Sequence, residues 1–151
     1  MALIYLNIGA GNRIRKPPWC NHDLHKHRPE IDFVWDLNKT PWPWSANGVA
    51  QIDATSVFEH LTITLIEALD ECWRILAPNG ALHLKFPVHT GPFTHDDPTH
   101  RWFWSEKVVD YVDVTTKYGA EHPYYTKRKW TIRSKSTEGG RNCWVHMVPV
   151  K

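Results

Sequence analysis

The residues with the clearest capacity for chemistry fall into two groups. The first is the turn Gly9-Ala10-Gly11, which follows the apolar stretch 2–8, together with Asp23 a short distance downstream. Glycine has no Cβ, so a glycine turn at the end of a buried strand lets backbone N–H groups approach a ligand closely. We therefore predict a ligand lying over the tip of this strand, with the Asp23 carboxylate as a hydrogen-bond acceptor.

The second group lies in the irregular stretch 89–101. Its polar side chains of catalytic type are His89, His95, Asp96, Asp97, His100 and Arg101. A loop this long in a compact chain is usually functional or disordered, and its carboxylates and imidazoles are candidates for a general base. The same side chains are of metal-ligating type, but they lack the regular spacing of a dedicated site, so we predict no metal.

A sheet must position both groups. Short β-prone runs bounded by glycine, proline and polar residues predict strands at 2–8, 20–24, 31–37, 49–54, 81–87, 128–135 and 142–150. A helix is predicted to begin after Thr64, which forms a capping box with Glu67, and to end at the turn 78–80. A shorter helix is predicted from Ser105 to about Val112, and residues 138–141 join the last two strands as a hairpin.

This order of elements predicts an α/β fold, with residues 1–151 forming a single Rossmann-like three-layer domain. Its sheet is expected to be mostly parallel and twisted, with an antiparallel C-terminal hairpin and reduced helices. Ligands of such sheets bind beyond the carboxyl ends of the strands. The glycine turn, Asp23, Asp36, residues 54–55 and the loop after Pro87 should therefore surround one site.

The gap between the glycine turn and the acid is unusually short. Gly11 and Asp23 are 12 positions apart, whereas a dinucleotide-binding unit places its ribose-binding acid about 20 residues on, after a full helix. The first crossover helix is therefore predicted to be reduced or missing. Without a strong helix N-terminus to attract a pyrophosphate, a ligand lacking phosphate fits better than NAD.

Composition narrows the classes of protein further. The net charge is +2, which is too small to indicate binding to duplex nucleic acid or to an anionic membrane. Three scattered cysteines do not make a disulfide framework and are expected to be reduced thiols. No apolar run reaches the roughly 20 residues of a membrane span, and the N-terminus has no signal-peptide pattern. We therefore expect a cytoplasmic protein.

Six stretches carry a family resemblance in the right order: 6–12, 21–24, 35–44, 56–61, 73–80 and 97–101. Among them, Ser56-Val57-Phe58-Glu59-His60-Leu61 resembles the motif "vLEHL", and Asp97-Pro98-Thr99-His100-Arg101 resembles a "DPtH" loop. Together they resemble compact class I S-adenosylmethionine-dependent methyltransferases of the type 11 kind. The resemblance covers roughly residues 3 to 105 and implies a transferase that uses S-adenosyl-L-methionine as its cofactor.

The resemblance also implies roles for individual residues. Asp23 would hold the ribose hydroxyls, and Asp36 and Leu37 would read the adenine edge. The cofactor-binding residues that it implies are Asn7, Gly9, Ala10, Gly11, Asp23, Leu24, Asp36, Leu37, Ala54 and Thr55. Asp97 and His100 would be the catalytic residues, because they lie on the motif-like part of the irregular loop.

Several positions depart from the family pattern. Ala50 stands near the start of the fourth strand where an acid is common, and "LKPGG" has become residues 76–80, in which Asn79 would take the left-handed turn. No helix precedes the first strand, so a second subunit or the 89–101 loop is expected to cover the pocket, and a homodimer is one such arrangement. These departures keep open a non-catalytic S-adenosylmethionine-binding module or partner subunit, and, less favoured, another nucleotide-binding enzyme.

The methyl acceptor is not given by any motif. No Asp-Pro-Pro-aromatic or Pro-Cys motif of DNA methylases is present. A cluster of cations (Arg13, Arg15, Lys16, Lys26 and Arg28) is interleaved with tryptophans (Trp19, Trp42, Trp44, Trp102 and Trp104). Cations and aromatic rings together can bind single-stranded nucleic acid or a sugar phosphate. We therefore favour a small molecule, a sugar or a nucleotide over duplex DNA.

Overall fold

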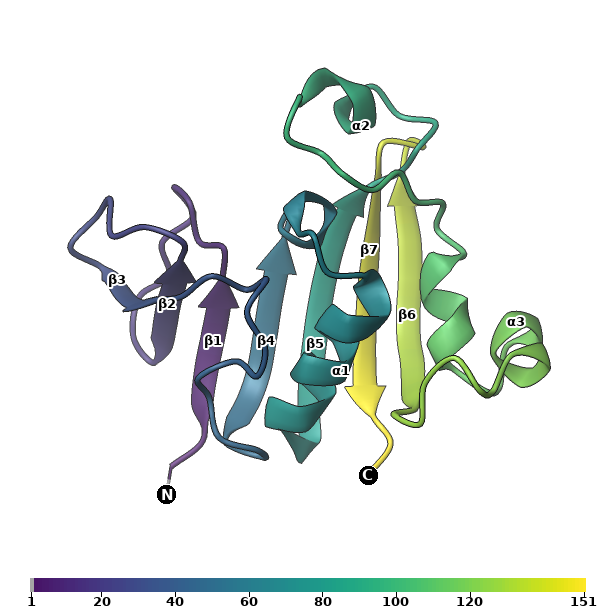
Figure 1. The fold of residues 1–151 in the computed structure, drawn as a ribbon, viewed down its shortest axis with the longest axis horizontal. Helices are drawn as coiled ribbons and strands as arrows, with labels where there is room; N and C mark the ends of the chain where they lie inside the picture. Colours follow the sequence, from purple (N-terminus) through teal and green to yellow (C-terminus); the bar gives the residue numbers. More distant parts are fainter. Residues whose placement is uncertain (1) are drawn as a thin grey trace.

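A seven-stranded sheet forms the centre of the computed structural model, which describes residues 2–151 (Figure 1). Its strands are β1 (Ile4–Ile8), β2 (Trp19–Asp23), β3 (Ile31–Val34), β4 (Val49–Thr55), β5 (Leu76–Pro87), β6 (Trp130–Glu138) and β7 (Asn142–Pro149). They follow the order β3-β2-β1-β4-β5-β7-β6, and β7 runs in the opposite direction to the other six strands. The predicted mostly parallel sheet with a C-terminal hairpin is confirmed.

The helices are few and short, as predicted. They are η1 (Phe58–His60), α1 (Leu65–Ile75), α2 (Phe93–Asp96), η2 (Val108–Val112) and α3 (Lys117–Glu121). The capping box at the start of α1 is present: Glu67 N–H donates to Thr64 Oγ1 at 3.2 Å, and Thr64 N–H donates to Glu67 Oε2 at 2.7 Å. None of the helices in the described part of the chain is long and apolar enough to cross a membrane.

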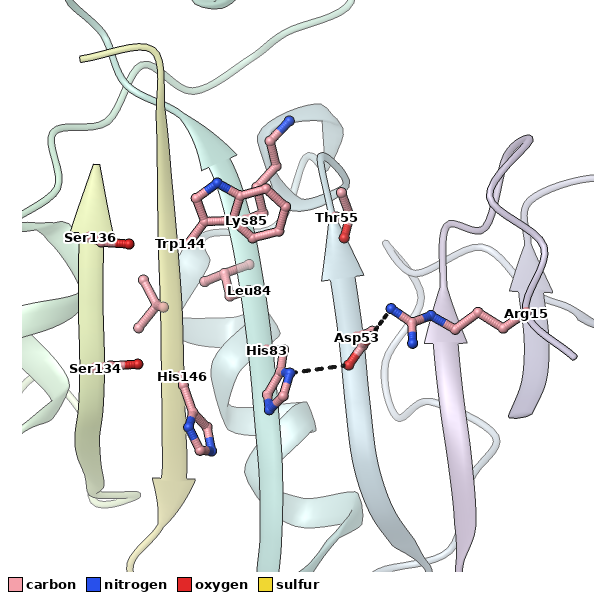
Figure 2. Close-up of a pocket in the computed structure, with 11 residues that line it drawn as sticks. Arg15, Asp53, Thr55, His83, Leu84, Lys85, Ser134, Ser136, Trp144 and His146 are labelled. Carbon is pink, nitrogen blue, oxygen red and sulfur yellow. Dashed lines mark ion pairs between the residues drawn. The ribbon is translucent and has the colours of Figure 1, made fainter. Parts of the chain in front are cut away.

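The two faces of the sheet differ. α1 lies over one face (Figure 1), where buried Leu69, Cys72 and Ile75 pack in the apolar core with sheet residues such as Ile52 and Leu84. The opposite face carries polar and aromatic side chains, among them Asp53 of β4, His83 of β5 and Trp144 of β7 (Figure 2). Loop 12–18, rather than a helix, supplies cover there over β1 and β2, since Asn7 Nδ2 donates to Arg13 O. The expected third layer is thus reduced to a loop.

Three predicted element boundaries are wrong. β5 begins directly at Leu76, so the stretch 78–80 is not a turn; instead residues 77–80 bulge opposite Ala50. Neither Asn79 nor Gly80 has a positive φ. β3 ends at Val34, because Trp35 to Leu37 leave the sheet edge and turn towards the neighbouring cleft. Helix η2 is a 3₁₀ turn that begins at Val108, later than a helix capped by Ser105 would, and ends at Val112 as predicted.

Two other local predictions, the C-terminal hairpin and the reduced cysteines, are confirmed. The hairpin between β6 and β7 turns at Gly139 and Gly140, both with positive φ. Cys20, Cys72 and Cys143 are free thiols. The carboxyl ends of β1, β4 and β5 meet at one edge of the sheet, next to η1 and α2, and the chain termini lie at the other edge (Figure 1). This edge is where the candidate site lies.

Candidate functional site

The glycine turn at the end of β1 is held in a left-handed conformation. Gly9 has φ +61° and Gly11 has φ +52°, which glycine adopts without the cost that a Cβ imposes. A Cβ on Gly9 would lie 2.4 Å from Val57, so Gly9 is a packing position. A Cβ on Gly11 would have no neighbour within 4 Å, so Gly11 faces open space.

Asp23 and His22, at the end of β2, hold this turn. Gly11 N–H donates to Asp23 Oδ2 at 2.7 Å, and Leu24 N–H donates to Asp23 Oδ1 at 2.7 Å. His22 Nδ1 accepts from Gly9 N–H at 3.3 Å, while its Nε2 donates to Trp35 O at 2.9 Å. Burial lowers the pKa of His22, which favours the neutral ring that this pattern requires. Each Asp23 oxygen keeps lone-pair capacity for a further donor.

A cleft of about 330 Å³ opens over this turn. Its wall consists of Gly9, Gly11, His22, Asp23, Leu24, Trp35, Asp36, Leu37, Asn38, Ser56, Val57, His60 and Leu61. Asp36 Oδ1 accepts from Asn38 N–H at 3.0 Å, which fixes the chain where it leaves β3. The volume and the few converging polar groups are typical of a small-molecule site.

Six of the predicted cofactor-binding residues line this cleft: Gly9, Gly11, Asp23, Leu24, Asp36 and Leu37. Four lie elsewhere. Asn7 is 5% exposed and donates to Arg13 O and Asn21 Oδ1. Ala10 and Ala54 are buried, and Thr55 faces a cavity on the opposite side of the sheet (Figure 2).

Ser56 and Val57 take the place on the cleft wall that the sequence assigned to residues 54 and 55. Ser56 has φ +55°, which is uncommon for a residue other than glycine and often marks a functional position. His22, Trp35, Asn38, His60 and Leu61 also line the cleft and were not predicted as site residues. All five lie in stretches that carry the family resemblance (21–24, 35–44 and 56–61), which is the signal that could have found them; the tertiary fold shows which residues of these stretches reach the cleft.

A second cavity, of about 670 Å³, adjoins the first and shares Ser56 and His60 with it. Its other lining residues are Arg13, Glu59, Lys85, Pro87, Phe93, Asp96, Asp97, Pro98, His100 and Asn142. Lys85 Nζ donates to Ser56 Oγ at 2.8 Å, and burial together with nearby Arg13 lowers the pKa of this amine. Both residues predicted as catalytic, Asp97 and His100, therefore lie in a cavity next to the glycine-turn cleft.

Glu59 is the most unusual residue of this second cavity. It is 1% exposed, and among residues 2–151 neither of its carboxylate oxygens has a hydrogen-bond partner. Burial raises its pKa to about 7. His100 Nε2 lies 3.9 Å from Glu59 Oε1 and 3.8 Å from Asp97 Oδ2. Glu59, His60 and His100 each place one potential ligand atom within 4.8 Å of the others, a cluster that the sequence-based prediction of no metal did not foresee.

A third cavity, on the open sheet face, contains the paired side chains of Figure 2. Asp53 forms an ion pair with Arg15, lies 3.7 Å from His83 Nδ1, and accepts from Gln51 Nε2 at 2.9 Å. Its carboxylate is therefore fully engaged by neighbouring side chains. In this respect it is the reverse of Glu59.

Only part of the predicted cluster of cations and tryptophans lies at the surface. Trp42, Trp44 and Trp104 are 2%, 6% and 8% exposed, so they belong to the core. Of the cations, Arg15 is engaged with Asp53 and stacks 4.3 Å from the Trp19 ring. A stacking platform for single-stranded nucleic acid needs exposed rings, and these three rings are not available for it.

No family model and no curated protein sequence matches this chain. Solved structures do. A methyltransferase from Archaeoglobus fulgidus dependent on S-adenosylmethionine has a TM-score of 0.67 at 11% identity, covering 97% of this chain and 86% of that one. A Haloferax volcanii complex contains the methyltransferase activator Trm112 and a protein proposed to be a methyltransferase; it matches with a TM-score of 0.63 at 12% identity, over 98% and 84% of the two chains.

The [4+2]-cyclase SpnF is a third similar structure, with a TM-score of 0.63 at 11% identity over 97% of this chain and 75% of that one. At these identities the similarity concerns the fold. The chain has the class I S-adenosylmethionine-dependent methyltransferase fold. Because a cyclase shares it, the fold alone does not define the reaction.

Proposed function

We propose that this protein binds S-adenosylmethionine in the cleft over Gly9 and Gly11 and transfers its methyl group to an acceptor in the adjoining cavity. The observation that carries the proposal is the pairing of the two cavities at the carboxyl ends of the parallel strands, where they share Ser56 and His60. Methyl transfer needs a donor and an acceptor aligned in contact, which two adjoining cavities provide.

The residues present fit the cofactor. Asp23 offers a carboxylate at a strand tip, suited to a ribose diol, and Gly11 leaves the backbone open to a ligand. Asp36 and Leu37 would contact the adenine. S-adenosylmethionine supplies an electrophilic methyl group on a sulfonium, so the protein has mainly to align the reactants.

Where the acceptor atom carries a proton, a residue beside the acceptor would remove that proton as the methyl group is transferred. His100 Nδ1 lies 2.9 Å from Thr94 O, and a carbonyl oxygen only accepts, so the ring donates there and keeps its Nε2 lone pair. That lone pair makes His100 the proposed general base, and Asp97, 3.8 Å away, would stabilise the imidazolium. We propose a small molecule, sugar or nucleotide as the acceptor.

Calorimetry tests cofactor binding directly. Titrations with S-adenosylmethionine, S-adenosylhomocysteine and NAD should show binding of the first two. Asp23→Ala should weaken S-adenosylmethionine binding about 100-fold, since hydrogen bonds to a charged group are worth about 1.5–3 kcal/mol. Glu30→Ala, which removes an exposed acid away from the cleft wall, is the matched control. Unchanged affinity in Asp23→Ala, or binding of NAD alone, would refute the proposed cleft.

The alternative is a non-catalytic S-adenosylmethionine-binding module that acts as a partner subunit. The exposed sheet face, where the Trp144 side chain is 46% exposed, and the Trm112 complex of the Haloferax structure favour it. Transfer of radiolabelled methyl groups to small molecules and RNA of a cell extract separates the two functions. Sedimentation of the purified chain tests the predicted homodimer at the same time.

A further inference from the structure

Three side chains that commonly bind metal ions converge beside the proposed acceptor cavity. Glu59 and His60 lie on η1, shortly after β4, whereas His100 follows α2 about forty positions further along the chain. Each places one potential ligand atom within 4.8 Å of the other two. The His60 and His100 rings are 4.6 Å apart between centroids. Two imidazoles and one carboxylate are the His₂Glu ligand set found in catalytic zinc sites.

The buried Glu59 carboxylate is suited to binding a cation. Glu59 is 1% exposed, and among the described residues no donor reaches Oε1 or Oε2. An ionised carboxylate without a partner in such a place is strongly unfavourable, and proteins normally pair it or use it to coordinate a metal. The closest imidazole nitrogen, His100 Nε2, is 3.9 Å from Oε1, beyond hydrogen-bond distance.

The hydrogen bonds around both histidines leave the other ring nitrogen free to bind a cation. His100 donates from Nδ1 to Thr94 O, as described above. Thr99 Oγ1 donates its only proton to Asp97 Oδ1 at 2.7 Å, so it must accept from His60 Nδ1 at 2.8 Å. Both rings therefore keep an Nε2 lone pair. Metal-ligating histidines almost always donate their second ring N–H to a carbonyl, carboxylate or similar partner in this way.

We propose that Glu59, His60 and His100 form a binding site for a divalent transition-metal ion of the Zn²⁺ or Co²⁺ type. Two nitrogens and one carboxylate oxygen suit these ions better than Mg²⁺ or Ca²⁺, which prefer all-oxygen sets. Zn–N and Zn–O bonds of about 2.0–2.2 Å require the side chains to close in by about 1 Å. Three protein ligands leave at least one coordination position for a molecule in the cavity.

That open position gives the site a role, which rests on the proposed function. The cavity that contains Glu59, His60 and His100 is the one proposed to hold the acceptor. An ion there would bind an oxygen or nitrogen of the acceptor and lower the pKa of that group, so with the ion bound His100 would act as a ligand in place of its role as general base. His60 lines both cavities and would hold the ion next to the cofactor cleft. The acceptor would then be a molecule with a metal-binding oxygen or nitrogen.

Co²⁺ is the probe that tests the site, because its visible absorption reports the ligand field. The chain of residues 1–151, freed of metal with a chelator, should bind one Co²⁺ with visible d–d bands that Zn²⁺ displaces. His100→Ala should weaken Co²⁺ binding by at least about 100-fold, the upper end of what loss of an outer-shell partner costs. Glu59→Gln should do the same while the chain stays folded, since the amide N–H₂ can donate to the His100 lone pair.

His146→Ala is the matched control. His146 and His83 form a second imidazole pair with ring centroids 4.6 Å apart, and His83 lies 3.7 Å from the Asp53 carboxylate. That carboxylate is already held by Arg15 and Gln51. His146→Ala should therefore bind Co²⁺ as the unmodified chain does.

Two results would overturn the proposal: no d–d bands at millimolar Co²⁺, or bands that persist in both Glu59→Gln and His100→Ala. The first would mean that a proton, rather than a metal, balances Glu59. S-adenosylmethionine binding is measured on the same samples by calorimetry. Co²⁺ binding without S-adenosylmethionine binding leaves the metal site standing and refutes the proposed function; the converse refutes the metal site alone.

Discussion

The two adjoining cavities at the carboxyl ends of the strands are built in opposite ways. In the cleft over the glycine turn, the carboxylate of Asp23 is satisfied on both oxygens by backbone N–H groups of Gly11 and Leu24. In the second cavity, the carboxylate of Glu59 is more deeply buried and has no donor within residues 2–151. The fold itself therefore satisfies the Asp23 carboxylate, whereas a proton or a cation must balance the Glu59 carboxylate.

The difference separates two ways of preparing a site. A preorganised backbone turn binds with little rearrangement, and its geometry depends on steric fit at glycine positions. A buried carboxylate without hydrogen-bond partners instead has an unfavourable desolvation free energy, which a bound cation or proton reduces. Substitutions in the two cavities should consequently change different properties: conformational stability in the first, and pH dependence or cation affinity in the second.

The largest effect is expected for Gly9→Ala. Its Cβ would meet Val57 at 2.4 Å, and φ is +61°. Overpacking costs about 1–3 kcal/mol and the left-handed conformation about 1–2 kcal/mol more, so the free energy of unfolding should fall by about 4 kcal/mol. Gly11→Ala shares the strained φ but has no neighbour within 4 Å, and should lose only the conformational part. Urea denaturation of the pair measures the difference; equal losses would show that the Val57 contact is unimportant.

A smaller effect is expected from the ionisation of Glu59 in the metal-free chain. Its pKa in the folded state is about 7, against an ordinary value of 4.5. The folded state therefore holds a proton that the unfolded state has lost between these values, and stability falls as pH rises through this window. The raised pKa corresponds to a loss of about 3 kcal/mol from pH 4.5 to pH 7, at about 1.4 kcal/mol per unit.

Thermal or urea unfolding of the chelator-treated chain across this pH range measures that loss. Glu59→Gln has no charge to bury, so its profile should lack this slope while the contributions of other groups remain. If both chains showed the same slope, Glu59 would not be the group responsible. Excess Co²⁺ should also flatten the profile of the unmodified chain near pH 7, because the ion compensates the carboxylate charge.

The two cavities also differ in how well the sequence alone predicts their residues. The glycine-turn cleft is largely predictable, because Gly9, Gly11 and Asp23 lie at the ends of adjacent parallel strands and each strand is marked by its own apolar run. The sheet order and the hairpin are likewise consistent with local patterns. Four predicted cofactor residues lie off the cleft wall. Asn7 and Thr55 do so because alternate residues of a strand face opposite sides of the sheet, and Ala10 and Ala54 because they are buried.

The second cavity is not predictable in this way. Glu59 and His60 are contiguous, but His100 reaches them only through the fold of the 89–101 loop, where Thr94 O and Thr99 Oγ1 orient the two rings. The mistaken turn at residues 78–80 has a related cause. Proline, asparagine and glycine favour a turn locally, but pairing of β5 with β4 draws these residues into a bulge of the strand.

The smallest effect is expected for Thr99→Val, which tests whether the two cavities are independent. The substituted side chain would keep the volume but lose the hydroxyl that links Asp97 to His60 Nδ1. His60 would then lose its orienting partner, and Co²⁺ affinity should fall about 10-fold, the lower end of outer-shell effects. The same substitution should leave S-adenosylmethionine affinity unchanged, since Thr99 does not line the glycine-turn cleft. A parallel loss of both affinities would mean that His60, which borders both cavities, couples them, and that cofactor and cation bind as one linked site rather than two.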